Sequence, residues 1–143
     1  MFSKACEYAL RAILYLSLNS SEDRKLGIKE ISEELNLPSP FLGKILQNLV
    51  RHKILDSTKG PNGGFYFKKN SKKVPIIKIV EIIDGLEFFE KCGMGLKHCS
   101  GEKPCPIHNQ LMPYRQKLKQ LLEEKTIADL TIVLENGKAF LQN

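Results

Sequence analysis

The 143-residue chain lacks an apolar run near the roughly 18 residues that a membrane-spanning helix needs, which excludes a helical membrane protein. It also lacks the basic start and small-residue cleavage site of a signal peptide, so we expect a cytoplasmic protein. Internal repeats and low-complexity segments are absent as well. With 42% hydrophobic residues, the length suits one compact domain.

Signs of an enzyme are missing. No cysteine is paired with a catalytic base, and no glycine-rich nucleotide motif opens a strand–helix unit, because the only glycine-rich stretch is residues 59–64. We therefore expect a protein that is not an enzyme. A small redox enzyme or electron carrier is the alternative from another class.

Acidic residues are scarce in one part of the chain. The formal net charge is +6, and residues 40–75 hold eight lysines and arginines but one acid, Asp56. Residues 74–143 hold equal numbers of basic and acidic side chains. A basic segment of this density suits a polyanion such as DNA, because each neutralised phosphate releases counterions. The alternative is a solvated basic surface.

Hydrophobic spacing predicts helices over residues 3–18, 28–35 and 39–52. Strand-like runs at 54–58 and 65–68 flank the turn-rich residues 59–64. This order is typical of a winged helix-turn-helix, with a generic small α/β domain as the alternative. Ser39 is predicted as the N-cap of the third helix, and Pro40 as its first residue.

The third helix is predicted to have an apolar inner face and a basic, polar outer face. The inner residues are Phe41, Leu42, Ile45, Leu46, Leu49 and Val50; the outer ones are Gly43, Lys44, Gln47, Asn48 and Arg51.

The second half is predicted to be helical around a loop. An almost entirely apolar helix covers residues 75–84, and residues 86–104 contain three glycines without periodicity. A long helix with a leucine stripe spans about 106–125, and Thr126 with Asp129 predicts a capping box that opens a last helix. We expect a mainly α fold with a small β-hairpin wing, in which residues 1–74 and 75–143 pack as one unit.

Three cysteines, Cys92, Cys99 and Cys105, lie within 14 residues, and a reducing compartment disfavours disulfides. The six and five residues between them are wider than a zinc knuckle, and a glycine-containing loop can wrap around something larger than one ion. Spacing leaves open an iron–sulfur cluster, a single zinc ion, or free or oxidised thiols. We expect Cys6, on the first helix, to be a small core residue.

Several motifs, in order, resemble the IscR/NsrR (Rrf-type) family of winged-helix transcription regulators. They are Glu7-Tyr-Ala-Leu-Arg-Ala12, Ile28-Lys-Glu-Ile-Ser32, Lys59-Gly-Pro-Asn-Gly-Gly-Phe65, Ile82-Ile-Asp-Gly85, the three cysteines, and Thr126-Ile-Ala-Asp-Leu130. The resemblance implies a homodimeric repressor that binds a palindromic operator through the third helix and the wing. The DNA-contact residues expected from it are Ser39, Pro40, Lys44, Gln47, Asn48, Arg51, Lys59, Gly60, Asn62 and Gly63.

The same resemblance implies an iron–sulfur cluster on Cys92, Cys99 and Cys105, which would sense iron–sulfur status, nitric oxide or redox state. The expected fourth ligand is His108, which favours a [2Fe-2S] over a [4Fe-4S] cluster. Glu7 of a partner subunit is the alternative fourth ligand. Some relatives are cluster-free and respond to a metabolite or a partner protein, which is the alternative function.

Overall fold

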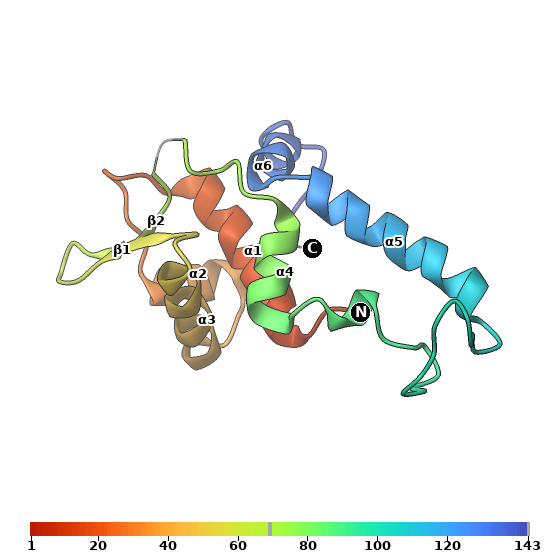
Figure 1. Cartoon of the computed structure of the whole chain (residues 1–143). Helices are drawn as coiled ribbons and strands as arrows, with labels where there is room; N and C mark the ends of the chain where they lie inside the picture. The colour runs from red at the N-terminus through yellow and green to blue at the C-terminus, as the bar shows by residue number, and fades with distance from the viewer. Residues whose placement is uncertain (69, 143) are drawn as a thin grey trace.

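The protein is mainly helical with one two-stranded antiparallel hairpin, as a computed structural model of residues 1–68 and 70–142 shows (Figure 1). The elements, in order, are α1 (Lys4–Asn19), α2 (Ile28–Leu35), α3 (Ser39–Arg51), β1 (Asp56–Thr58), β2 (Gly64–Tyr66), α4 (Ile76–Asp84), the 3-10 turn η1 (Glu87–Phe89), α5 (His108–Glu124) and α6 (Ile127–Glu135). The expected fold class is confirmed. The turn η1 lies where sequence patterns predicted only a loop.

Helix α1 forms the centre of the core. Its apolar face is fully buried at Ala9, Ala12, Ile13 and Leu16, and it contacts α2, α3, α4 and α6. The apolar helix α4 is covered by α1, α3 and α5, as its composition required. The helices of the two halves of the chain therefore share one core.

The wing is shorter than predicted, and a third backbone segment supports it. Asp56 pairs with Tyr66 across the hairpin, while Leu26 and Phe65 exchange two backbone hydrogen bonds of 3.0 and 2.8 Å. Gly64 has a φ of +148°, and a Cβ atom there would lie 2.6 Å from the Leu26 carbonyl oxygen. Only glycine therefore fits where these backbones meet.

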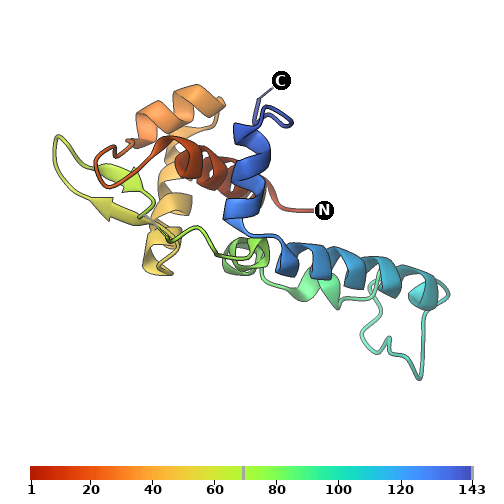
Figure 2. The same ribbon diagram turned by 90° about the horizontal axis from the view of Figure 1, so that it is seen from above.

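Helix α5 projects away from the other helices, and residues 86–104 lie toward its far end (Figures 1 and 2). We call residues 85–107, between α4 and α5, the cysteine loop. Directly after α5 in the chain, the Thr126 hydroxyl accepts a 3.1 Å hydrogen bond from the Asp129 amide. The Asp129 carboxylate accepts a 2.9 Å hydrogen bond from the Thr126 amide. This capping box confirms the predicted start of α6. No helix in the described ranges is both long and apolar enough to cross a membrane.

Candidate functional site

The outward face of α3 carries basic and amide side chains. Lys44, Gln47 and Arg51 are exposed, whereas Asn48 is half-buried and accepts a 3.4 Å hydrogen bond from the Arg51 guanidinium. Lys44 and Arg51 form no salt bridge within the described ranges. Both cations are therefore available to an anionic partner.

The start of α3 differs from the prediction. Pro38 is the N-cap, and Ser39 and Pro40 are the first two helical residues. The Ser39 hydroxyl donates a 2.8 Å hydrogen bond to the Ser32 hydroxyl on α2, so it links the two helices instead of capping one. The prediction was wrong because an extended proline can end the loop without a side-chain cap.

Two residues of α3 face the other way from the prediction. Phe41, expected inside, is 63% exposed and borders an open cavity together with Ala5 and Tyr8 of α1. Gly43, expected outside, faces α2: a Cβ atom there would lie 3.1 Å from the Ile28 side chain. The missing side chain lets α2 and α3 approach closely.

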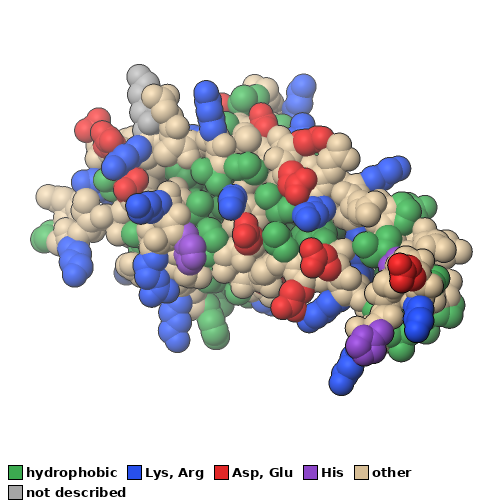
Figure 3. All heavy atoms as spheres, viewed as in Figure 1, with side chains coloured by type: hydrophobic (Ala, Val, Ile, Leu, Met, Phe, Trp, Pro, Cys, Tyr) green, Lys and Arg blue, Asp and Glu red, His purple; other side chains and the backbone are tan. Residues whose placement is uncertain are grey.

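The wing tip presents Lys59, Gly60 and Asn62 to solvent. The Gly63 amide donates to the Gly60 carbonyl at 2.9 Å, so it closes the turn and is not free for a phosphate. Figure 3 shows lysine and arginine side chains gathered over the wing and α3 on the face in view. Part of the basic excess of the sequence thus lies on one face formed by the wing and α3.

The fold brings the three loop cysteines together. Their sulfur atoms all lie within 4.8 Å of one another, and all four cysteines of the chain, Cys6 included, are free thiols. His108 opens α5, is half-buried, and places Nδ1 3.1 Å from the Cys99 sulfur. We call Cys92, Cys99, Cys105 and His108 the cysteine site. His98, next to Cys99 in sequence, is exposed.

Backbone amides stabilise thiolates in this site. Hydrogen bonds from the Leu96 and Met94 amides, and from the other two thiols, outweigh burial and lower the pKa of Cys92 to about 7. The Cys105 amide donates to the Cys99 sulfur at 3.3 Å and favours its thiolate, but burial and the hydrogen bonds with the Cys92 and Cys105 thiols together raise the pKa of Cys99. The lowered pKa of Cys92 favours its thiolate, the form that binds metals.

Three thiols and an imidazole form a soft donor set, which suits zinc or iron bound to sulfide. The three sulfur atoms, all within 4.8 Å of one another, stand close enough to share one ion. The cavity that they border has a volume of only about 10 Å³. A cluster with bridging sulfides requires the loop to widen. Residues 93–98 are all exposed and include two glycines, so no core packing opposes this movement.

Comparison with known proteins shows the family to which the chain belongs. The model of the Rrf2 family, described as iron-dependent transcriptional regulators, matches residues 2–132. The chain belongs to the Rrf2 family. It is 32% identical over 137 residues to a protein of Aquifex aeolicus (strain VF5) assigned as an HTH-type transcriptional regulator, with 94% of each chain covered. It is 27% identical to the HTH-type transcriptional regulator NsrR of Oceanobacillus iheyensis, covering 89% of this chain and 86% of that one.

Solved structures agree on the fold. T. potens IscR superposes with a TM-score of 0.74 at 17% identity, covering 98% of this chain and 92% of that one. This Rrf2 protein is therefore a DNA-binding transcription regulator of winged-helix fold and not an enzyme.

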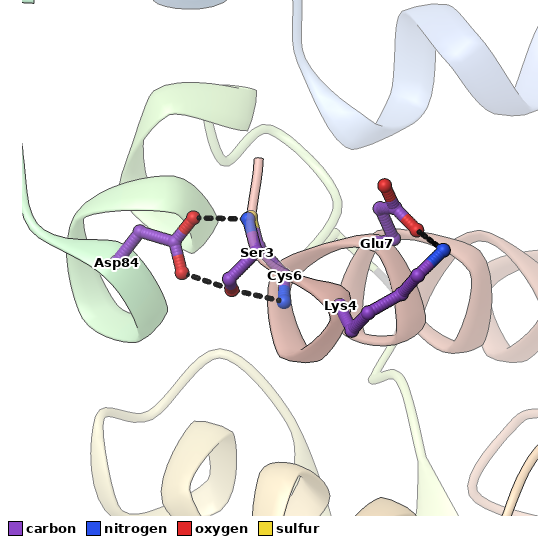
Figure 4. Close-up of polar contacts among 5 residues, drawn as sticks. All are labelled: Ser3, Lys4, Cys6, Glu7 and Asp84. Carbon is purple, nitrogen blue, oxygen red and sulfur yellow. Dashed lines mark hydrogen bonds and ion pairs between the residues drawn. The ribbon is translucent and has the colours of Figure 1, made fainter. Parts of the chain in front are cut away.

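Two further residues of the Rrf2 chain, Glu7 and Cys6, lie on α1 (Figure 4) and are not among the residues that gather at the cysteine site. Glu7 is exposed on α1 and pairs with Lys4 at 3.1 Å. Cys6 is fully buried, and burial, with smaller contributions from the Asp84 and Glu7 carboxylates, raises its pKa to about 12. Cys6 is the core residue that was expected.

Sequence reasoning noted Asp84, the last residue of α4, only as part of the motif Ile82-Ile-Asp-Gly85 and gave it no role. Its carboxylate accepts hydrogen bonds from both the amide (2.9 Å) and the hydroxyl of Ser3, and the Ser3 hydroxyl in turn caps α1 by accepting from the Cys6 amide at 3.1 Å (Figure 4). A carboxylate at a helix C-terminus opposes the helix dipole, and this unfavourable position is the physical signal that Asp84 has a partner elsewhere in the chain.

Proposed function

We propose that the chain is a homodimeric repressor whose operator affinity depends on an iron–sulfur cluster held by Cys92, Cys99, Cys105 and His108. The observation that carries the proposal is the convergence of three sulfurs within 4.8 Å, with a histidine nitrogen 3.1 Å from one of them. We favour a [2Fe-2S] cluster because His108 resembles the histidine ligand of IscR with its two-iron cluster, whereas four protein ligands would by themselves serve either cluster type.

The cluster, when bound, supplies a centre that iron supply, oxidants or nitric oxide can change. The chain's own residues would carry that change to DNA. The cysteine loop, which contains η1, directly follows α4, and the last residue of α4, Asp84, binds Ser3 at the start of α1. Helix α1 contacts α3, so one continuous set of packed elements connects the loop with the recognition helix.

In this proposal, residues 1–74 bind DNA. Helix α3 enters the major groove with its outward face toward the DNA. From that face, four side chains contact bases or phosphates: Lys44, Gln47, Asn48 and Arg51. The wing residues Lys59, Gly60 and Asn62 reach the neighbouring groove, while Ser39, Pro40 and Gly63 shape the two contacting elements. We propose a cytoplasmic protein, because the chromosome that carries an operator lies in the cytoplasm of the bacterial relatives.

Residues 75–143 would form the dimer. Helix α5 buries only Leu122 within the described ranges, whereas Tyr114 is 72% exposed and Leu121 is 49% exposed. A second copy would cover this face, and a two-fold dimer matches a palindromic operator with half-sites about 34 Å apart. The dimer would also decide whether Glu7 of the partner subunit replaces His108 as a ligand.

Anaerobic purification tests the cluster. We expect a coloured protein with equal amounts of iron and acid-labile sulfide, and an electron paramagnetic resonance signal after reduction. The His108→Ala variant should keep iron but change that signal. A colourless protein with stoichiometric zinc would contradict the proposal.

DNA binding and dimerisation are tested separately. A palindromic duplex selected from random DNA should bind the loaded and metal-free proteins with different affinities. Sedimentation should show a dimer for the wild-type chain and a shift toward monomer for Leu121→Glu. Equal affinities in both states would leave a DNA-binding protein that does not sense through the cluster.

A further inference from the structure

One face of α5 follows the cysteine loop residue by residue. His108 contacts Cys99, a Cβ on Gly93 would lie 2.5 Å from the Leu111 side chain, and Arg115 binds the Lys91 carbonyl. Positions 108, 111 and 115 recur at helical spacing, while the loop residues that they meet run in the opposite direction. The cysteine loop thus packs along one face of α5, in the opposite direction to the helix.

Of the three α5 residues that contact the loop, Arg115 lies farthest along the helix, and it makes two contacts. Its guanidinium donates a hydrogen bond to the Lys91 carbonyl oxygen and lies 5.2 Å from the centre of the Phe88 ring on η1. Both contacts fix the chain immediately before Cys92. Because guanidinium is planar, it can bind a carbonyl in its plane while its face rests on an aromatic ring.

Arg115 also brings a positive charge to the border of the cysteine site. It borders the small cavity between the thiols, together with Glu90 and Lys91. Lys91 pairs with Glu87 at 2.8 Å, whereas Arg115 has no carboxylate partner in the part of the chain that is described. Arg115 therefore keeps an unpaired positive charge where three thiolates would gather.

We propose that Arg115 is a positioning residue of the cysteine site, which anchors the segment that carries Cys92 and offsets the negative charge of the bound thiolates. This inference rests on the proposed function, because it assumes that the site binds metal. It adds a residue outside the ligand set that controls how tightly the metal is held.

Trypsin tests the anchor without any metal. Trypsin cleaves after Lys91, whose carbonyl Arg115 holds, so Arg115→Gln should speed cleavage of the Lys91–Cys92 bond in the metal-free full chain. Phe88→Leu removes the ring under the guanidinium and should act in the same direction, more weakly. Lys117→Gln removes one exposed charge from the same helix and should leave the rate unchanged.

Cobalt(II) tests the effect on metal binding. Anaerobic titration of the metal-free chain should give thiolate-to-cobalt absorption bands, and Arg115→Gln should weaken cobalt affinity about 10- to 100-fold, the usual effect of losing an outer partner of a metal ligand. Arg115→Lys keeps the charge but not the planar contact, so it should restore part of the affinity. Circular dichroism checks that each variant is folded.

The outcomes separate this inference from the proposed function. If the wild-type chain binds cobalt and Arg115→Gln matches it in affinity, spectrum and trypsin cleavage, the role of Arg115 is overturned while the site stands. If the wild-type chain shows no thiolate bands with cobalt and no cluster, the proposed site fails and the inference fails with it.

Discussion

The contact between Ser3 and Asp84 joins the start of α1 to the end of α4, so its removal should be measurable in stability. The Ser3 hydroxyl caps α1 and donates to Asp84, and the Ser3 amide donates to the other carboxylate oxygen at 2.9 Å. Three hydrogen bonds thus converge on two exposed side chains.

Ser3→Ala removes the N-cap acceptor, which costs about 1 kcal/mol, and a hydroxyl–carboxylate bond, which at an exposed site adds about 0.5 kcal/mol. Asp84→Ala leaves both Ser3 donors bonded to water, which lowers the free energy of unfolding by about 1 kcal/mol. About 0.3 kcal/mol of this loss is regained, because a carboxylate no longer opposes the α4 dipole. We expect the double variant to lose about 0.5 kcal/mol less than the two single losses together, because they share one bond.

Urea unfolding of the four proteins, metal-free and at one protein concentration, measures these free energies. Each 1 kcal/mol corresponds to a fall of about 2–4 °C in Tm for a chain of this size. Glu81→Gln is the control, because it removes an acid from the same last turn of α4 without touching Ser3. Single losses below about 0.3 kcal/mol that simply add would refute the contact.

Three further outcomes follow from the geometry. Lys44→Ala and Arg51→Ala should each lower the salt slope of operator binding by about 0.9 where a phosphate contact is lost; unchanged affinity and slope for both would move the DNA interface to another surface. The rate at which iodoacetamide modifies Cys92 of the metal-free protein should be half-maximal near pH 7, since the thiolate forms as pH rises through a pKa of about 7. Cys6, with a pKa of about 12, should stay unmodified below pH 9. Mass spectrometry of the alkylated peptides measures both, and equal labelling of the two cysteines would contradict the prediction. Gly64→Ala places a methyl group 2.6 Å from a backbone oxygen, so it should destabilise the fold by about 1–3 kcal/mol in urea, and a wild-type midpoint would show that the wing does not pack on Leu26.

Much of the fold was predictable from local sequence. The spacing of Ile28, Ile31 and Leu35 predicted α2 with its observed bounds, and Thr126 with Asp129 predicted the capping box of α6. These features depend on residues within one or two turns of each other, so they can be predicted without knowing any distant contact.

The errors arose where distant segments meet. The pairing of Leu26 with Phe65 was missed, because a single paired residue between polar neighbours has no alternating pattern to detect. Phe41 and Gly43 were assigned to the wrong sides of α3, since their environment depends on where α2 lies against that helix.

By itself the sequence determined the order of helices, the basic first half, the three loop cysteines and the family motifs, because these are properties of composition and short spacing. Only the tertiary structure decided that the three sulfurs meet beside His108, that Arg115 holds the loop before Cys92, and that Asp84 binds Ser3. Ser3 and Asp84 lie 81 residues apart in the chain, and their contact depends on how α1 and α4 pack around a shared core, which no local pattern specifies.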